Sequence, residues 1–201
     1  MINIDLNMYP NRMAVLYSGG ADSTLLYYLV ISSIMQNYPE KSLDLIIVDR
    51  YNNPVDRATT LYNNIRLSIG DTITKLRFIP LPDSVPGHQQ VLQAVDKIKN
   101  EYDTIFWGIN QYPDDITIRP KNSSYQIDFE NFKAPDKLHL PFAKFKKTDI
   151  IETYIKLGIT DILYNTHSCG EPGAVPCGKC FNCRERIWAF TQLGLEPNLG
   201  I

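Results

Sequence analysis

The first 168 residues of this 201-residue chain contain no cysteine, and all four cysteines lie between Cys169 and Cys183. A disulfide-stabilised scaffold normally spreads its cysteines to connect distant segments, so an oxidised scaffold is not expected. The chain also lacks an apolar run of the roughly 18 residues that a membrane-spanning helix requires. Its first residues, MINID, have neither the basic nor the apolar character of a secretory signal. We therefore expect a soluble, cytoplasmic protein without a membrane partner.

An excess of basic residues is missing as well. Lys and Arg total 20 against 22 Asp and Glu, which gives a net charge of -2. This balance excludes a strongly basic nucleic-acid coat, and direct nucleic-acid binding is not expected. Hydrophobic residues make up 44% of the chain, which supplies a packed core and excludes a disordered protein. The length suits one domain, so residues 1–201 are expected to form a single unit.

Short apolar runs alternate with segments of helical periodicity in the first half of the chain. Strands are predicted at 13–17, 43–48, 75–79 and 104–108, and helices at 23–36, 56–68 and 89–100. This alternation is typical of an α/β fold with a mostly parallel, doubly wound sheet, which binds ligands at the carboxyl ends of its strands. Residues 110–141 form an irregular stretch of the kind that often carries function. Two further helices are predicted at 148–157, with Thr148 as the N-cap, and at 182–193.

The segment from Tyr17 to Thr24, YSGGADST, connects the first predicted strand to the first predicted helix. Its two glycines let the backbone approach a ligand closely, and the unpaired N–H groups of a helix start attract anions. The patterns G-x-x-x-x-G-K-[ST] and G-x-G-x-x-G are both absent, which disfavours the usual kinase-type phosphate loop and dinucleotide binding. The turn therefore predicts a phosphate site of another kind, and the alternative is a serine-capped turn without a ligand.

The four cysteines follow the spacing Cys169-x7-Cys177-x2-Cys180-x2-Cys183. Four thiolates within one short loop suit a tetrahedral zinc ion, whose closed sulfur shell would make its role structural. An iron–sulfur cluster, and a set of disulfides or free thiols, are the alternatives. We expect residues 166–201 to form a zinc-binding segment that pins the C-terminal tail beside the ligand-binding end of the sheet.

Two motifs together resemble a known family. The S-G-G-x-D-S turn resembles the pyrophosphate loop of the PP-loop ATPases, and the C-terminal segment resembles that of 7-cyano-7-deazaguanine synthases, the QueC family. Thr166-His167-Ser168-Cys169 matches the family's T-x-S-C, and residues 177–186 match C-G-x-C-x-x-C-x-x-R. Tyr112-Pro113-Asp114 resembles a Y-P-D triplet, Leu140-Pro141 with Lys147 a P-L…K segment, and Val85-Pro86-Gly87 the start of V-P-G-R-N.

The resemblance implies an enzyme that uses ATP, magnesium and ammonia to convert 7-carboxy-7-deazaguanine into 7-cyano-7-deazaguanine, with release of AMP and pyrophosphate. It also implies a homodimer and a structural zinc ion. Asp22 would place magnesium or orient pyrophosphate, and Lys147 or Arg119 would supply positive charge, although Lys147 could be an ordinary solvated lysine. Tyr112 and Asp114 would contact the deazaguanine, or else form a plain proline turn. ATP contacts are implied for Tyr17, Ser18, Gly19, Gly20, Ala21, Asp22, Ser23, Thr24 and Asp49.

The chain departs from the family pattern at the loops expected to hold the base. Asp49-Arg50-Tyr51-Asn52-Asn53 stands where the family has D-Y-G-Q-x-H, and His88-Gln89 stands where it has R-N. The loop after Gly108 is shorter. Loops at the ends of strands set specificity, so a different acceptor or a reaction that stops at the amide stays open. Two other readings also stay open: another PP-loop ligase or tRNA-modifying enzyme, and a zinc-containing module that senses nucleotide without turnover.

Overall fold

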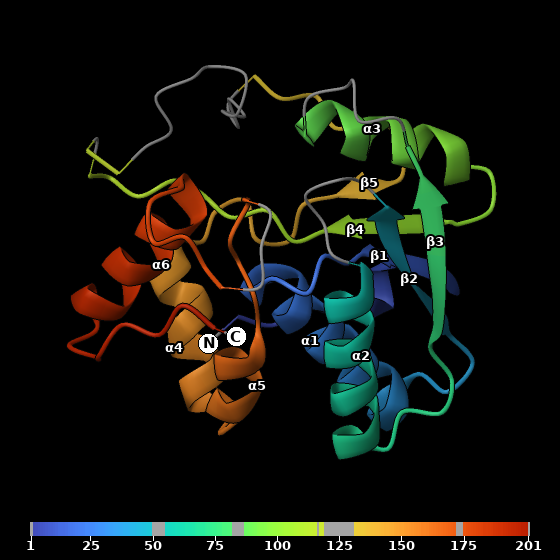
Figure 1. The fold of residues 1–201 in the computed structure, drawn as a ribbon. Helices are drawn as coiled ribbons and strands as arrows, with labels where there is room; N and C mark the ends of the chain where they lie inside the picture. The colour runs from blue at the N-terminus through green and yellow to red at the C-terminus, as the bar shows by residue number, and fades with distance from the viewer. Residues whose placement is uncertain are drawn as a thin grey trace.

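The fold is built on a five-stranded, fully parallel sheet in the order β3-β2-β1-β4-β5 (Figure 1). The computed structural model describes residues 2–49, 55–81, 87–115, 117–118, 131–171 and 175–200. The strands are β1 (Arg12–Leu16), β2 (Ser42–Asp49), β3 (Lys75–Pro80), β4 (Thr104–Trp107) and β5 (Leu138–His139). The predicted α/β fold with a parallel sheet is therefore confirmed.

Helices cover both faces of the sheet. A short 3-10 turn, η1 (Leu6–Met8), precedes the first strand, and the helices are α1 (Ala21–Asn37), α2 (Val55–Ile69), α3 (Gly87–Ile98), α4 (Lys147–Lys156), α5 (Thr160–Asn165) and α6 (Phe181–Gln192). Val15 of β1 points into a core shared with α1, α2 and the C-terminal helices, whereas its neighbours Ala14 and Leu16 point into a second core under α3. Successive side chains of a strand alternate between faces, so one apolar strand serves both cores.

The C-terminal helices pack one after another onto α1. Helix α4 packs against α1, and α6 packs against α4 (Figure 1). Within the described residues, none of the helices combines the length and the hydropathy needed to cross a lipid bilayer.

The predicted N-cap of α4 is wrong. Thr148 does not cap α4, because the helix begins at Lys147 and Lys146 is the N-cap residue. The backbone N–H of Lys146 instead donates a hydrogen bond to Asp149 Oδ2 at 2.7 Å. The Asp149 carboxylate, three residues after the N-cap, thus accepts the hydrogen bond of a backbone N–H at the start of the helix, so a hydroxyl cap is not needed. This one-residue difference places Lys147 on the first turn of the helix.

Candidate functional site

The glycine turn between β1 and α1 is closed by its own two serines. The Ser18 backbone N–H donates to Ser23 Oγ at 3.1 Å, the two hydroxyl oxygens lie 3.1 Å apart, and Ser23 Oγ donates to Gly20 O at 3.3 Å. Gly19 has a φ of +73°, which favours glycine. The turn is therefore held in one shape at the start of α1, where the first N–H groups have no acceptor within the helix itself.

Close packing on two sides requires glycine in and beside this turn. A Cβ on Gly19 would lie 3.1 Å from Ala58 Cα of α2. On the other side, a Cβ on Gly108, directly after β4, would lie 3.1 Å from Asp22 O. The turn thus lies between α2 and the carboxyl end of β4, where a parallel sheet binds ligands.

Side chains in this segment divide into buried and accessible ones. Tyr17, Ala21 and Thr24 are almost fully buried. Ser18 is exposed, and Asp22 is partly exposed. Asp49 ends β2 at the same edge of the sheet, since β1 and β2 run parallel.

Lys147 lies directly against Asp22. Its Nζ is 2.6 Å from Asp22 Oδ1, although 125 residues separate the two in the chain. A second carboxylate, Glu185 Oε2 of α6, lies 3.4 Å from the same ammonium. Burial alone would lower the pKa of Lys147, but the charges of Asp22 and Glu185 outweigh it and raise this pKa. The lysine is therefore protonated at neutral pH and is not a solvated surface residue.

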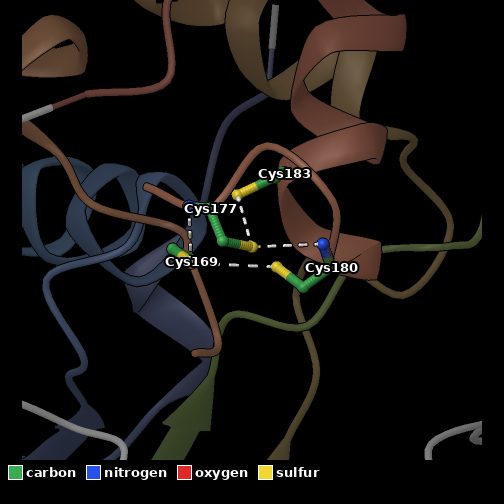
Figure 2. A group of neighbouring side chains, drawn as sticks. All are labelled: Cys169, Cys177, Cys180 and Cys183. Carbon is green, nitrogen blue, oxygen red and sulfur yellow. Dashed lines mark hydrogen bonds between the residues drawn. The ribbon is translucent and has the colours of Figure 1, made fainter. Parts of the chain in front are cut away.

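The four cysteine sulfurs converge on one point (Figure 2). All four lie within 4.8 Å of one another, with 3.9 Å between the sulfurs of Cys169 and Cys180 and 4.0 Å between those of Cys177 and Cys183. Metal–sulfur bonds of about 2.3 Å in a tetrahedron would separate the sulfurs by about 3.8 Å. The arrangement therefore fits one ion held by four thiolates.

Backbone N–H groups stabilise the thiolate form of this cluster. Cys177 Sγ accepts hydrogen bonds from the N–H of Cys180 at 3.3 Å and of Lys179 at 3.4 Å. These two bonds lower the pKa of Cys177 to about 6. Burial, in contrast, raises the pKa of Cys183. A metal ion would compensate for that burial, because it binds the deprotonated sulfur.

The cysteine segment docks onto the glycine turn. The N–H of His167 donates to Gly19 O at 3.0 Å, and the N–H of Ala21 lies 3.4 Å from Ser168 Oγ. Arg186 of α6 also binds this segment, because its guanidinium donates hydrogen bonds to Thr166 Oγ1 at 2.7 Å and to Ser168 Oγ at 3.2 Å. The segment that leads into the cysteine loop therefore lies against the glycine turn after β1.

Comparison with known proteins gives a consistent result. The family model described as "Queuosine biosynthesis protein QueC" matches residues 93–194. The 7-cyano-7-deazaguanine synthase of Caldicellulosiruptor saccharolyticus is 40% identical over 92% of this chain and 93% of its own length. That of Caldicellulosiruptor bescii is 27% identical over 92% of this chain and 95% of its own length. The chain belongs to the QueC family.

A solved structure supports the fold of this QueC-family chain. The U34-tRNA thiolase NcsA from Methanococcus maripaludis, solved with its [4Fe-4S] cluster, superposes with a TM-score of 0.54 at 17% identity. The match covers 96% of this chain and 68% of the thiolase. At this identity the likeness concerns the shared PP-loop fold alone.

The residues expected to contact the base are only partly brought together. The ring of Tyr112 packs edge-on against Phe181, the first residue of α6, with 5.6 Å between ring centres. Asp114 forms an ion pair with Lys146, next to Lys147. Arg119 lies outside the described residues. In this QueC-family chain the Y-P-D segment therefore adjoins the start of α6.

Sequence reasoning missed Glu185 and its partner Asn110. Both are buried, and Asn110 Nδ2 donates to Glu185 Oε1 at 3.0 Å. One signal was available: Glu185 follows the last cysteine by two residues and is flanked by two arginines. An acid among bases at a helix start favours a specific contact over a solvated face. The partner, however, could not be identified from the sequence.

Proposed function

We propose that this protein converts 7-carboxy-7-deazaguanine and ammonia into 7-cyano-7-deazaguanine, with two ATP molecules cleaved to AMP and pyrophosphate. The observation that carries the proposal is the packing of the QueC-type T-x-S-C segment onto an ordered PP-loop, through His167 and Gly19. Relatives named for this activity match nearly the whole chain.

The PP-loop supplies the nucleotide site in this proposal. The N–H groups at the start of α1, with the Ser18 and Ser23 hydroxyls, would bind the phosphates that leave as pyrophosphate. Asp22 is the partly exposed carboxylate at this point, and it would orient pyrophosphate or hold magnesium, which supplies positive charge to the phosphates. Asp49 would contribute at the neighbouring strand end.

Lys147 would act on the negative charge that develops during both adenylations. In the first, the substrate carboxylate attacks the α-phosphate and pyrophosphate leaves; ammonia then displaces AMP and gives the amide. In the second, the amide oxygen is adenylated, and loss of AMP with two protons leaves the nitrile. The Lys147 ammonium is buried and held at hydrogen-bond distance from Asp22. It is therefore already in place to stabilise the developing charge, and no water molecules have to reorient during the reaction.

The base pocket is proposed at the irregular stretch after β4. Tyr112 and Asp114 would contact the deazaguanine, and Arg119 is a further candidate. Support comes from the packing of Tyr112 against α6 and of Asp114 against Lys146, which brings this segment to the lysine end of the site.

Zinc is the metal we infer for the cysteine cluster. The sulfur–sulfur separations suit a single tetrahedral ion. An iron–sulfur cluster places several irons and sulfides between the thiolates and needs a wider spacing. The role of the ion would be structural, since four sulfurs leave no open position.

Domain organisation, assembly and location complete the proposal. Residues 1–201 would form one domain with 166–201 as its zinc-binding segment, because Arg186 and His167 tie that segment to α5 and to the PP-loop. We infer a cytoplasmic homodimer that takes its ammonia as free ammonium and does not bind nucleic acid directly.

The test is release of AMP and pyrophosphate from Mg-ATP and ammonium, with and without 7-carboxy-7-deazaguanine, and with the product identified by mass spectrometry. A nitrile that depends on the carboxylate substrate is expected. Lys147→Met should lower its rate about 100- to 1,000-fold and leave a measurable residual rate, whereas Lys156→Met, at the exposed end of the same helix, should leave the rate unchanged. Absence of substrate-stimulated AMP release from the wild type would overturn the assignment, and an amide as the end product would restrict it to the first half-reaction.

A further inference from the structure

Glu185 is a buried carboxylate to which the proposed reaction assigns no role. Its residue exposure is 3%, and it lies in the first turns of α6. Asn110 holds its Oε1 at 3.0 Å, which leaves Oε2 facing the Lys147 ammonium at 3.4 Å. An isolated buried carboxylate is costly, so its retention here calls for a specific partner. That partner is the ammonium of Lys147.

Lys147 needs more than one negative partner. It is the first residue of α4, where the helix dipole opposes a positive charge. It is also buried, which opposes the charge further. Asp22 and Glu185 together offset both effects. Asp22 lies in the first turn of α1 and Glu185 in the second turn of α6, so these two helices and α4 each contribute one residue to the same ion-pair cluster.

The two acids differ in how free they are to leave the lysine. The Asp22 side chain is 22% exposed and lies in the PP-loop, where the proposed chemistry draws it toward magnesium and phosphate. The Glu185 side chain is 4% exposed and fixed by Asn110. If Asp22 were the only partner, its departure would leave a buried ammonium uncompensated, and the lysine would follow Asp22 or lose its proton.

We infer that Glu185 is a positioning residue that holds the Lys147 ammonium at the PP-loop when Asp22 turns toward the nucleotide. The inference rests on the proposed function where it is tested by kinetics. Its crystallographic test depends only on where the Lys147 side chain lies. It assigns Glu185 no contact with substrate, because the residue acts through Lys147.

The kinetic test uses Glu185→Gln, which keeps an oxygen for Asn110 but removes the charge facing Lys147. We expect kcat to fall about 10- to 100-fold with little change in the KM for ATP, since the lysine acts on developing charge. In a Lys147→Met background the same change should have no further effect, because two residues that act through one group are not additive. Glu152→Gln, an exposed acid on α4, is the matched control and should behave as wild type.

Two results would overturn the inference. One is an unchanged kcat in Glu185→Gln, and the other is an equal fold-loss of kcat when Glu185→Gln is made in the wild type and in Lys147→Met. Asn110→Ala is the second variant and keeps both charges while removing the bond that orients Glu185. It should lower kcat less, about 3- to 10-fold, and again only when Lys147 is present. Cysteine-bound metal, measured per chain, should stay at the wild-type level in all these variants.

A structural readout is independent of turnover. In crystals of the wild type with magnesium and α,β-methylene-ATP, Lys147 Nζ should stay within ion-pair distance of Glu185 while Asp22 turns to the nucleotide. In Glu185→Gln it should move away with Asp22. A lysine that leaves Glu185 in the wild type would refute the positioning role. Failure of wild-type turnover with the deazaguanine substrate would refute the proposed function instead, and this crystallographic comparison would still decide the role of Glu185.

Discussion

Replacing Arg186 with methionine should destabilise the fold, because its guanidinium is the main polar link between α6 and the segment that meets the PP-loop. The side chain is almost completely buried. Its three shortest hydrogen bonds go to Asn198 O at 2.6 Å, Thr166 Oγ1 at 2.7 Å and Leu163 O at 2.8 Å. Burial lowers the pKa of Arg186 to about 10, so it remains charged at neutral pH.

The magnitude follows from what methionine restores and what it does not. It fills a similar apolar volume and removes a buried charge, but it leaves three oxygens, Asn198 O and both oxygens of Thr166, without their donor. Leu163 O still accepts hydrogen bonds from Thr166. At about 1–3 kcal/mol for each orphaned group, and with the relief of the buried charge counted against it, we expect a loss of about 3–4 kcal/mol. For a chain of this size that corresponds to a fall in Tm of about 6–16 °C.

The assay is urea unfolding of Arg186→Met, followed by circular dichroism, with Arg12→Met as the control. Arg12 is exposed at the start of β1, and its variant should lie within about 0.5 kcal/mol of wild type. A loss below about 1 kcal/mol in Arg186→Met would refute the reasoning, since it would mean that water satisfies the three oxygens. An equal loss in both variants would show that the effect is not specific to the buried network.

Three further changes test other parts of the structure. Gly19→Ala should lower the AMP-release rate at least about 10-fold, because a Cβ would meet Ala58 at 3.1 Å and the φ is +73°; a wild-type rate would contradict this. Cys183→Ser should reduce bound zinc, measured by elemental analysis, and lower Tm. Burial would raise the pKa of Asp71, but hydrogen bonds from Thr74 and Tyr27 lower it overall. The ionised Asp71 therefore adds to the free energy of unfolding above its ordinary pKa, and this contribution is lost as the pH falls through the folded pKa. In Asp71→Asn the free energy of unfolding, measured with urea, should consequently fall less steeply below about pH 4 than in the wild type.

Local patterns in the sequence predicted the elements that local physics dictates. The strands and helices up to residue 108 follow from apolar runs and periodicity, because each buries its residues against a sheet or along a helix stripe. Three short elements among the described residues escaped: η1, which has three residues, β5, which has two, and α5, which has six. None of them is long enough to show a period. Strand β5 forms because β4 offers a free edge, with Ile105 N donating to Lys137 O at 2.8 Å.

The site divides along the same line. The residues of the PP-loop lie within one short stretch of sequence, and so do the four cysteines. The spacing within each stretch therefore suggests a phosphate site and a metal site without any knowledge of the fold. The Lys147–Asp22 pair spans 125 residues and depends on how α4 packs against α1. Lys147 could be suggested by resemblance, but its burial and second carboxylate partner depend on tertiary packing. Glu185 is the extreme case, because its role exists only once α1, α4 and α6 are brought together.

A metal ion held by the four cysteines would influence the PP-loop site through the orientation of α6. The helix begins directly after Cys180 and carries Cys183 in its first turn, so the cluster fixes its rotation about its axis. One residue of slippage rotates a helix by about 100°. That rotation would turn Glu185 away from Lys147 and Arg186 away from Thr166 at once. The first two turns of α6 therefore connect the cysteine cluster to the Lys147–Asp22 pair.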